Sequence, residues 1–456
     1  MIHLPKVLAV GFFSAAVLLL IFQPDVFSDA ALRAAVLGLF CLGLWSGSIV
    51  PEFLTSIIFF LGAMLFAVAP ADVVFSGFYS AALWLVFAGL ILAVAVKMTG
   101  LGERIARFLA PRFGGTYLGI ITGVVVISVA LAFVMPATLG RIMLLAPIIL
   151  ALADRYGFGE GSEGRTGMAL ALGLGTFIPP FAILPANVPN MILVGASETL
   201  YGVVPVYGNY LLIHFPVLGV LKAMAIIAVV VTIFPDTPKP VEREALDRPQ
   251  KEESKLAIML VIALALWMTD FVHHISPAWI GLGAAVLCMV PGIGVVTARD
   301  FNEKVNLAPF IYVAGVMGLG AMVSHSGLGG LLGNLLIDIA DLRPGEDAWT
   351  FAVMAVLGAV IGPFVTNPGM PAVVAPLAGQ IAEASGLPTS TILMMMVITI
   401  SMVTLPFQAS PLIVAMQVMN VKMVDALKAC LILMAITLIV LMPINYYWWR
   451  VLGLLN

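Results

Sequence analysis

Apolar residues form blocks of about 20 along nearly the whole chain, and polar residues are confined to the short stretches between these blocks. A block of roughly 20 apolar residues is the length that crosses a bilayer as an α-helix. A series of alternating ten-residue strands, which would indicate a β-barrel, is absent from the sequence. The pattern therefore predicts an all-α polytopic membrane protein with about eleven transmembrane helices, at 6–22, 30–47, 52–70, 80–99, 166–198, 208–234, 255–273, 277–297, 307–326, 389–420 and 424–447.

Two further apolar segments are interrupted near their centres and are predicted to be re-entrant hairpins. In the first, 117–154, the arm after Pro136 covers 140–153 and would extend about 21 Å as a helix, less than the ~30 Å hydrocarbon core. Arginines on both sides of this segment favour the same membrane face, so both its ends are placed in the cytoplasm. The second segment, 349–384, has the same form, and the order of spans makes it enter from the outside.

A polar segment divides the chain into two hydrophobic halves. Residues 235–255 hold five of the 21 basic and six of the 24 acidic side chains, together with several prolines, which is typical of a solvated linker. We therefore expect an N-terminal helix at 1–29, a first half at 30–234, a cytoplasmic linker, and a second half at 256–456.

The two halves show a weak internal repeat. Aligning Pro147 with Pro376 also matches Gly140 with Gly369 in the two hairpins. The spans that follow, 166–198 and 389–420, contain "LPANVP" and "LPFQASP", each with Leu-Pro, a side-chain amide two residues later and a second proline. Because the copies would begin on opposite membrane faces, the sequence predicts an inverted-topology repeat, an architecture common among secondary transporters.

Composition and charge placement agree with this topology. Hydrophobic residues make up 62% of the chain and charged residues 10%, far from the balance of a soluble domain. The positive-inside rule places the N-terminus in the cytoplasm and the C-terminus outside, with a bacterial inner membrane as the expected location. The sequence has no basic stripe suited to nucleic acid and no metal-ligand spacing among its three cysteines.

Four proline-rich breaks are the candidate binding elements, at Pro136 to Gly140, Pro185 to Pro189, Pro363 to Pro371, and Pro406 to Pro411. Backbone groups freed at membrane depth are tolerated where they face protein or a watery cavity, and helix N-termini favour an anion. The side chains predicted to contact the substrate are those of Thr138, Arg141, Asn187, Asn190, Thr366, Asn367 and Gln408. The residues predicted to shape the breaks or bind a coupling ion are Ala137, Gly140, Pro189, Gly369, Ser410 and Pro411.

The two hairpins, the two broken helices and the eleven-span layout resemble the divalent anion/sodium symporter family. In that family each hairpin tip carries Ser-Asn-Thr, and the broken helices end in a Thr/Ser-Pro-Pro-Asn-like turn. The tips here read Ala137-Thr138-Leu139 and Thr366-Asn367-Pro368. The turns read Asn187-Val188-Pro189-Asn190, which keeps Pro-Asn, and Ala409-Ser410-Pro411-Leu412, which loses the asparagine.

The resemblance implies a homodimeric, elevator-type carrier without an organic cofactor. Its hairpin tips would hold a carboxylate or sulfate between two sodium sites. Both tips here have fewer polar oxygens than the family pattern, so Na+ and H+ both remain candidate coupling ions.

Arg141 is the most unusual residue in the first hairpin, because a guanidinium at the centre of a membrane helix costs roughly 2.5–3.5 kcal/mol. One interpretation is functional: it binds the anion directly, or it supplies permanently the charge that sodium supplies in the family. The other is structural: it extends toward the interface or pairs with a carboxylate. Lys222, the second cation at membrane depth, is interpreted as a structural lysine with a transport role as the alternative.

The predicted function is therefore a secondary carrier of a small anionic solute, most simply a di- or tricarboxylate or a similar oxyanion. A proton-coupled carrier of arsenite or another anion is the alternative within transport. A membrane-embedded enzyme is a remote alternative, because the sequence lacks an intramembrane His/Glu metal set and a G-x-S-x-G motif.

Overall fold

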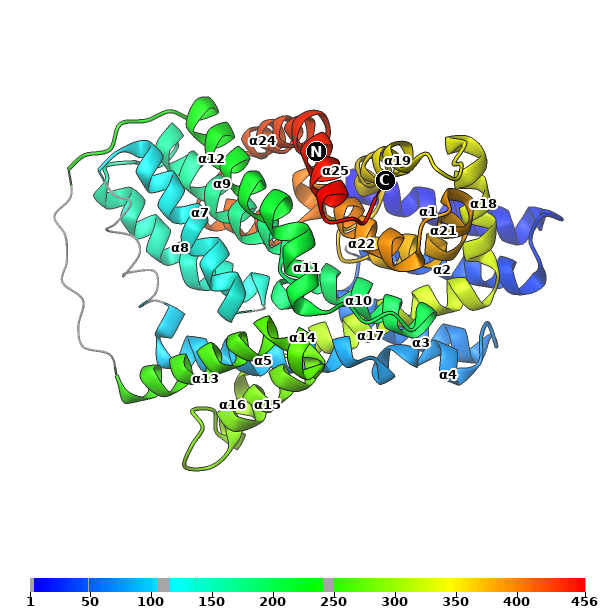
Figure 1. The fold of residues 1–456 in the computed structure, drawn as a ribbon, viewed down its shortest axis with the longest axis horizontal. Coiled ribbons are helices and arrows are strands. Elements are labelled where there is room, and N and C mark those ends of the chain that lie inside the picture. The colour runs from blue at the N-terminus through cyan, green and yellow to red at the C-terminus, as the bar shows by residue number, and fades with distance from the viewer. Residues whose placement is uncertain are drawn as a thin grey trace.

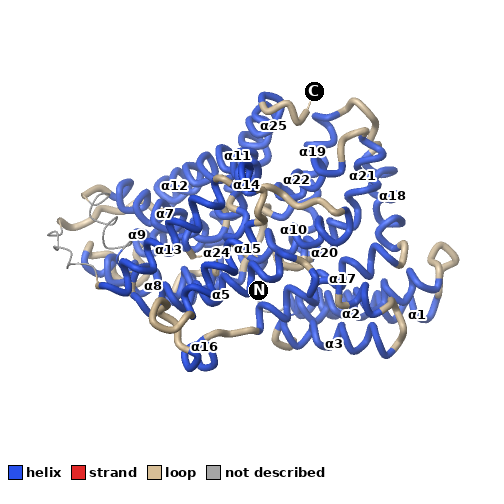
Figure 2. Tube along the Cα trace, turned by 60° about the horizontal axis from the view of Figure 1, so that its bottom comes forward, coloured by secondary structure: helices blue, strands red, loops and turns tan. Residues whose placement is uncertain are grey.

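The computed structural model describes residues 4–47, 49–102, 104, 115–135, 137–240 and 250–455. Figure 2 shows helices joined by loops, with no strand in this part of the chain. The all-α prediction is confirmed. Seven of the described helices, counting two that run through a π-helical turn, have the length and composition to cross a membrane.

In the described residues, the N-terminal helix α1 (Leu4–Phe22) is followed by ten helices of the first half, which include one hairpin and one broken helix. They are α2 (Asp29–Gly47), α3 (Glu52–Leu65), α4 (Ala71–Val74), α5 (Ala81–Thr99), α7 (Tyr117–Val134), α8 (Thr138–Arg155), α9 (Glu163–Phe177), α10 (Val188–Tyr201), α11 (Tyr207–His214) and α12 (Lys222–Ile233).

The second half repeats the order of hairpin, broken helix and long final helix. Its elements are α13 (Lys251–Met268), α14 (Asp270–His273), α15 (Pro277–Met289), α16 (Ala298–Lys304), α17 (Ala308–His325), α18 (Leu328–Ala340), α19 (Asp347–Ile361), α20 (Met370–Val374), α21 (Ala378–Ser385), α22 (Thr389–Ile400), α23 (Ser410–Val418), α24 (Met423–Ile436) and α25 (Met442–Val451).

The two hairpins lie close to where the sequence places them. Helices α7 and α8 form the first, with a turn between Val134 and Thr138; Pro136 itself lies outside the described residues. Helix α19 and the segment from Met370 to Ser385 form the second, in which a 3-10 turn around Pro376, Ala375–Leu377, separates α20 from α21. Proline lacks an N–H and clashes with the preceding turn, which favours such a local change of helix type.

Both broken helices are present, although the first break begins earlier than the sequence suggested. Helix α9 ends at Phe177, just before Pro179 and Pro180, and α10 resumes at Val188. Pro189 therefore lies in the first turn of α10, where its missing N–H has no helical partner to lose. The second break separates α22 from α23 and contains the short 3-10 turn Pro406–Gln408.

Three features were missed by the sequence analysis. A π-helical turn, Phe215–Leu221, joins α11 to α12, and another, Thr437–Leu441, joins α24 to α25. The first turn contains Pro216, and the second ends two residues before Pro443. Such π-helical insertions relieve the clash that a proline creates in a helix. The apolar helix α18 was also missed, because its 13 residues are too few for a span.

The helices form two groups that meet at the centre of the molecule. In Figure 1, α7, α8, α9 and α12 lie together on the left, whereas α1, α2, α18 and α21 lie on the right. Helix α17 packs against α2, α3, α5 and α10. Helices α8 and α9 both pack against α23, which brings the first hairpin next to the second broken helix.

Close approach of α17 to α3 depends on Gly315. A Cβ atom built at Gly315 would lie 2.3 Å from the Cβ of Ser56, so no larger residue fits without moving a helix. We predict that Gly315→Ala destabilises the protein by about 1–3 kcal/mol, the usual cost of overpacking. Thermal unfolding in detergent measures this, with Gly283→Ala as the control, because a Cβ there meets no atom within 4 Å. Equal melting temperatures for the two variants would contradict the packing.

Candidate functional site

A cavity of about 300 Å³ lies where the hairpin tips and broken helices meet. Its walls come from the first hairpin tip, from both breaks, from Pro368 of the second tip, and from α3, α5 and α17. The lining residues are Glu52, Phe53, Leu85, Val86, Gly89, Leu90, Ala137, Thr138, Leu139, Phe177, Pro185, Asn187, Val188, Pro189, Met191, Asn306, Ala308, Pro309, Tyr312, Pro368 and Pro411.

Two predicted substrate residues, Thr138 and Asn187, line this cavity. Thr138 begins α8, and its hydroxyl lies 3.4 Å from the carbonyl of Ala186 in the first break. Asn187 caps α10: its Oδ1 accepts a hydrogen bond from the Asn190 amide at 3.1 Å. The Asn187 Nδ2 atom is buried and has no hydrogen-bond partner among the described residues. Asn187 therefore offers a free donor at the cavity.

Three helices begin at the cavity wall, which gives the site a positive character without a cation in the lining. Thr138 starts α8, Val188 starts α10, and Pro411 lies in the first turn of α23; all three residues line the cavity. The first N–H groups of a helix have no intrahelical acceptor and carry part of the helix dipole. Such ends bind anions.

Arg141 does not line the cavity; it lies behind the first tip and is fully buried. Its Nη1 donates to the carbonyls of Met135 and Ala186, the latter at 2.9 Å. Its Nη2 donates to the carbonyl of Thr176 at 3.0 Å and to the hydroxyl of Thr138 at 3.2 Å. The guanidinium thus binds three backbone carbonyls and one hydroxyl that the hairpin and the break leave free.

These partners of Arg141 are neither the bound anion nor the carboxylate that the sequence analysis considered. In the structure no described carboxylate pairs with Arg141, and its side chain does not reach the lining of the cavity. Carbonyl and hydroxyl oxygens are the ligands that hard cations prefer. The oxygens that could hold a sodium ion at the first tip are occupied by the guanidinium.

Asn190, also predicted to contact substrate, instead holds the first break. It is fully buried, and its Nδ2 donates to the carbonyls of Pro180, Phe181 and Ile183 at 3.0 to 3.3 Å. The Pro180 and Ile183 carbonyls also accept from the amides of Ile183 and Ala186 at 3.0 Å, and the Phe181 carbonyl accepts from the Tyr210 hydroxyl at 2.8 Å. Asn190 therefore adds a second donor to carbonyls of the break, where hydrocarbon supplies none.

Asn367 and Gln408 perform the corresponding task in the second half. The Asn367 amide donates to the Gln408 carbonyl at 3.1 Å, and its Nδ2 donates to the Ile400 carbonyl at 2.7 Å. The Gln408 Oε1 accepts from the amides of Thr404, at 2.6 Å, and Leu405. Both side chains are fully buried and neither lines the cavity.

The remaining predicted residues divide between the cavity and the turns beside it. Ala137, Pro189 and Pro411 line the cavity. Thr366 and Gly369 form the turn of the second tip, where the Gly369 amide donates to the Thr366 carbonyl at 2.9 Å. Gly140 lies in the first turn of α8, outside the lining, and Ser410 begins α23.

The opposite wall holds polar residues that the sequence analysis did not select. Glu52 begins α3, Asn306 precedes α17, and Tyr312 lies within α17. None of them belongs to a proline-rich break, and only the packing of α3 and α17 places them opposite the tips. Lys222 is buried in α12 and is absent from the cavity lining. The described part of the chain contains no cluster of His, Cys, Asp and Glu suited to a metal ion.

Comparison with known proteins identifies the family. The sequence profile of the sodium:sulfate symporter transmembrane region matches residues 3–455. The chain belongs to this family. Membership of this transporter family contradicts the enzyme alternative.

The relatives of this chain are distant. A membrane protein of Cupriavidus necator is 25% identical over 290 residues, 61% of this chain and 56% of that protein. The sodium-dependent dicarboxylate transporter SdcS of Staphylococcus saprophyticus is 23% identical over 361 residues, 72% of this chain and 69% of that protein. The chain thus matches little more than half the length of the first of these relatives.

A solved structure has the same fold. The YdaH transporter of Alcanivorax borkumensis superposes with a TM-score of 0.55 at 13% identity, covering 93% of this chain and 99% of that one. At this identity the likeness between the two proteins concerns the fold alone.

Removing Arg141 should destabilise the protein strongly. In Arg141→Met the carbonyls of Met135, Thr176 and Ala186 lose their donor, and each buried unpaired group costs about 1–3 kcal/mol. We predict a loss of at least about 3 kcal/mol, measured by denaturant or thermal unfolding. Arg165→Met is the control: its ion pair with Asp154 is partly exposed and worth less than about 1 kcal/mol. Equal losses would mean that the carbonyls do not depend on Arg141.

Proposed function

We propose that this symporter-family protein is a secondary active carrier of a small di- or tricarboxylate or a similar oxyanion. The observation that carries the proposal is the convergence of three helix N-termini and the free Asn187 Nδ2 donor on one cavity. An anion there lies at the positive ends of the three helix dipoles, which favour negative charge. The cavity, at about 300 Å³, is of a size suited to a small solute.

We further propose an elevator mechanism acting on an inverted repeat. The moving part would comprise both hairpins, both broken helices and the final helix of each half; the scaffold would comprise α2, α3, α5, α13, α15 and α17. The proposal is supported by the cavity, whose lining comes from both the moving part and the scaffold. It is also supported by the packing of α8 and α9 against α23 within the moving part. Matching π-helical turns, Phe215–Leu221 and Thr437–Leu441, also favour related halves.

Ion coupling is proposed to differ from a two-sodium scheme. Arg141 binds three carbonyls and a hydroxyl at the first tip, so it acts as a fixed cation where a sodium ion would otherwise bind. Because Arg does not deprotonate in proteins, this charge is permanent and cannot leave with the substrate. Sodium at the second tip and a proton remain the candidate coupling ions.

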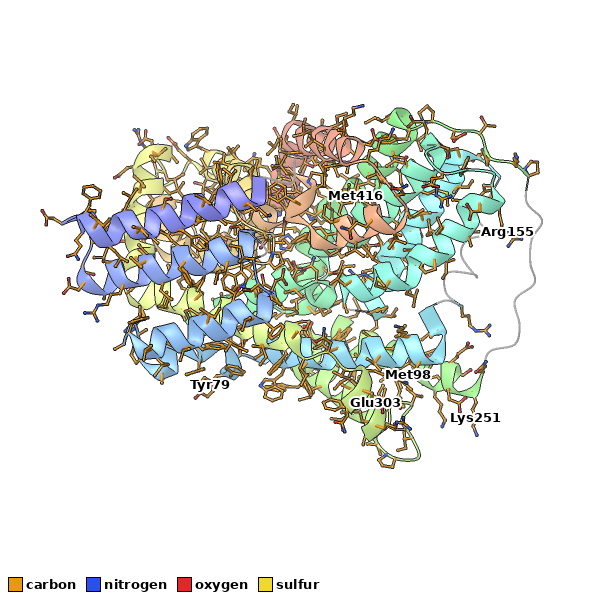
Figure 3. All side chains as sticks on the ribbon, turned by 180° about the vertical axis from the view of Figure 1, so that it is seen from behind. Tyr79, Met98, Arg155, Lys251, Glu303 and Met416 are labelled. Carbon is orange, nitrogen blue, oxygen red and sulfur yellow. The ribbon has the colours of Figure 1, made fainter. Side chains whose placement is uncertain are left out.

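The proposed topology places the N-terminus in the cytoplasm and the C-terminus outside, in a bacterial inner membrane, with a homodimer as the working assembly. Basic residues expected on one face lie together: Figure 3 shows Arg155 and Lys251 at the same end of the molecule. Arg104 after α5 pairs with Glu253 at the end of the linker at 2.6 Å, which joins two segments assigned to that face.

The proposed function is tested by anion binding with and without sodium. Purified protein is heated with sulfate, succinate or citrate, with either sodium or choline as the only cation. A ligand at 100 times its dissociation constant stabilises the folded state by about 2.7 kcal/mol, so a true substrate is visible. We predict stabilisation by at least one of these anions in choline. Failure of every anion in both salts would contradict an anion carrier.

Asn187→Asp separates binding from folding in this test. Asp still accepts the Asn190 amide and caps α10, so the melting temperature without ligand should be unchanged. The variant replaces the free Nδ2 donor with a negative oxygen, so anion binding should weaken by 100-fold or more, the scale of about 3 kcal/mol expected when a donor to a charged group is lost. Unchanged anion affinity would exclude Asn187 from the site.

A further inference from the structure

Among the described residues that line the cavity, Glu52 alone is charged at neutral pH. It lies in the first turn of α3, and its side chain is exposed. The lining residues on the other walls are apolar or carry neutral polar groups, among them Thr138, Asn187 and Tyr312. A cavity proposed to bind an anion therefore contains a carboxylate of its own.

The position of Glu52 is fixed by its backbone, whereas its carboxylate is left free. Trp45 Nε1 of α2 donates to the Glu52 carbonyl at 3.1 Å, and the Ser56 hydroxyl lies 3.5 Å from the same atom. In the part of the chain that the structure describes, the Glu52 carboxylate has neither an ion-pair partner nor a hydrogen-bond donor. An exposed carboxylate without a fixed partner can exchange a proton with water.

The groups that face Glu52 do not neutralise it. Of the helices packed against α3, α2 presents the neutral Trp45, α17 presents Tyr312, and α4 supplies no lining residue. Arg141 lies behind the first tip and its amino groups are bound to backbone and hydroxyl oxygens. The hydrogen-bonding capacity of both Arg141 amino groups is therefore already used away from Glu52.

Electrostatic repulsion from the Glu52 carboxylate opposes the binding of an anion in this cavity. Two like charges 4 Å apart repel by roughly 1 kcal/mol in water and about 4 kcal/mol near a protein surface. Inside a cavity of about 300 Å³ a dianion cannot move far from Glu52. Protonation of Glu52 removes this repulsion and turns the carboxylate into a hydrogen-bond donor.

We propose that Glu52 takes up a proton when the anion binds, so that each anion enters the cavity together with one proton. The inference rests on the proposed function, because it concerns an anion in this cavity. Glu52 is then a specificity-determining residue: protonated at low pH, it allows doubly charged solutes to bind, and ionised at high pH, it weakens their binding.

The test measures the dissociation constant of sulfate from pH about 5 to 9, a range in which the charge of sulfate is constant. Choline is the only cation, so sodium does not contribute. In the wild type the dissociation constant should rise about tenfold per pH unit above the pKa of the carboxyl group, as expected when binding is linked to one proton. Glu52→Gln should bind with a dissociation constant that does not change with pH and equals the wild-type value at low pH.

Two controls make the result specific. Glu303→Gln removes an exposed carboxylate of α16 that is not part of the lining, and should keep the wild-type pH dependence. A second measurement needs no variant: sulfate added to weakly buffered wild type near neutral pH should raise the bulk pH, because protons are taken up.

The outcomes separate this inference from the proposed function. Sulfate binding that is independent of pH in the wild type, no proton uptake, or an unchanged pH dependence in Glu52→Gln would each overturn the role of Glu52 and leave the anion carrier intact. Absence of sulfate, succinate and citrate binding at every pH would contradict the carrier itself, and the proton linkage with it.

Discussion

Backbone carbonyls that lose their helical partners inside the membrane must find other donors, and this requirement organises the centre of the protein. Hydrocarbon supplies no hydrogen bonds, so each break in a helix needs a dedicated side chain. Arg141 supplies it for the first hairpin, the end of α9 and the first break together, through Met135, Thr176 and Ala186. One buried cation thereby ties three separate segments into a single unit.

The same requirement explains why so few polar side chains remain for the substrate. Asn190 is used on three carbonyls of the first break, and Asn367 and Gln408 are used on backbone groups of the second tip and break. What remains at the cavity is three helix N-termini, the neutral polar side chains of Thr138, Asn187, Asn306 and Tyr312, and the carboxylate of Glu52. Recognition of an anion by backbone amides needs no charged side chain in the lining, which leaves the charge of Glu52 free to act as a selective element.

Much of this arrangement could be predicted from the sequence, because proline positions have local consequences. The hairpins and the broken helices follow from prolines within apolar runs, and residues of both tips and both breaks line one cavity. The π-helical turns escaped notice because a single proline in a long apolar helix is compatible with a simple kink.

Side-chain direction and long-range packing could not be predicted in the same way. Whether Asn190 points toward a substrate or back to Pro180 and Ile183 depends on the path of the break, which local sequence does not determine. Glu52 and Tyr312 come from α3 and α17, whose contact requires Gly315 to pack against Ser56 across more than half the chain.

The most direct test of the account is to ask whether sodium can replace the guanidinium. Arg141→Ser removes the charge and leaves the carbonyls of Met135, Thr176 and Ala186 beside the Thr138 hydroxyl. Anion-dependent thermal stabilisation is measured for this variant in sodium and in choline. If Arg141 acts as a fixed cation, stabilisation is lost in choline and restored by sodium. Equal stabilisation in the two salts, at the wild-type level, would contradict that role.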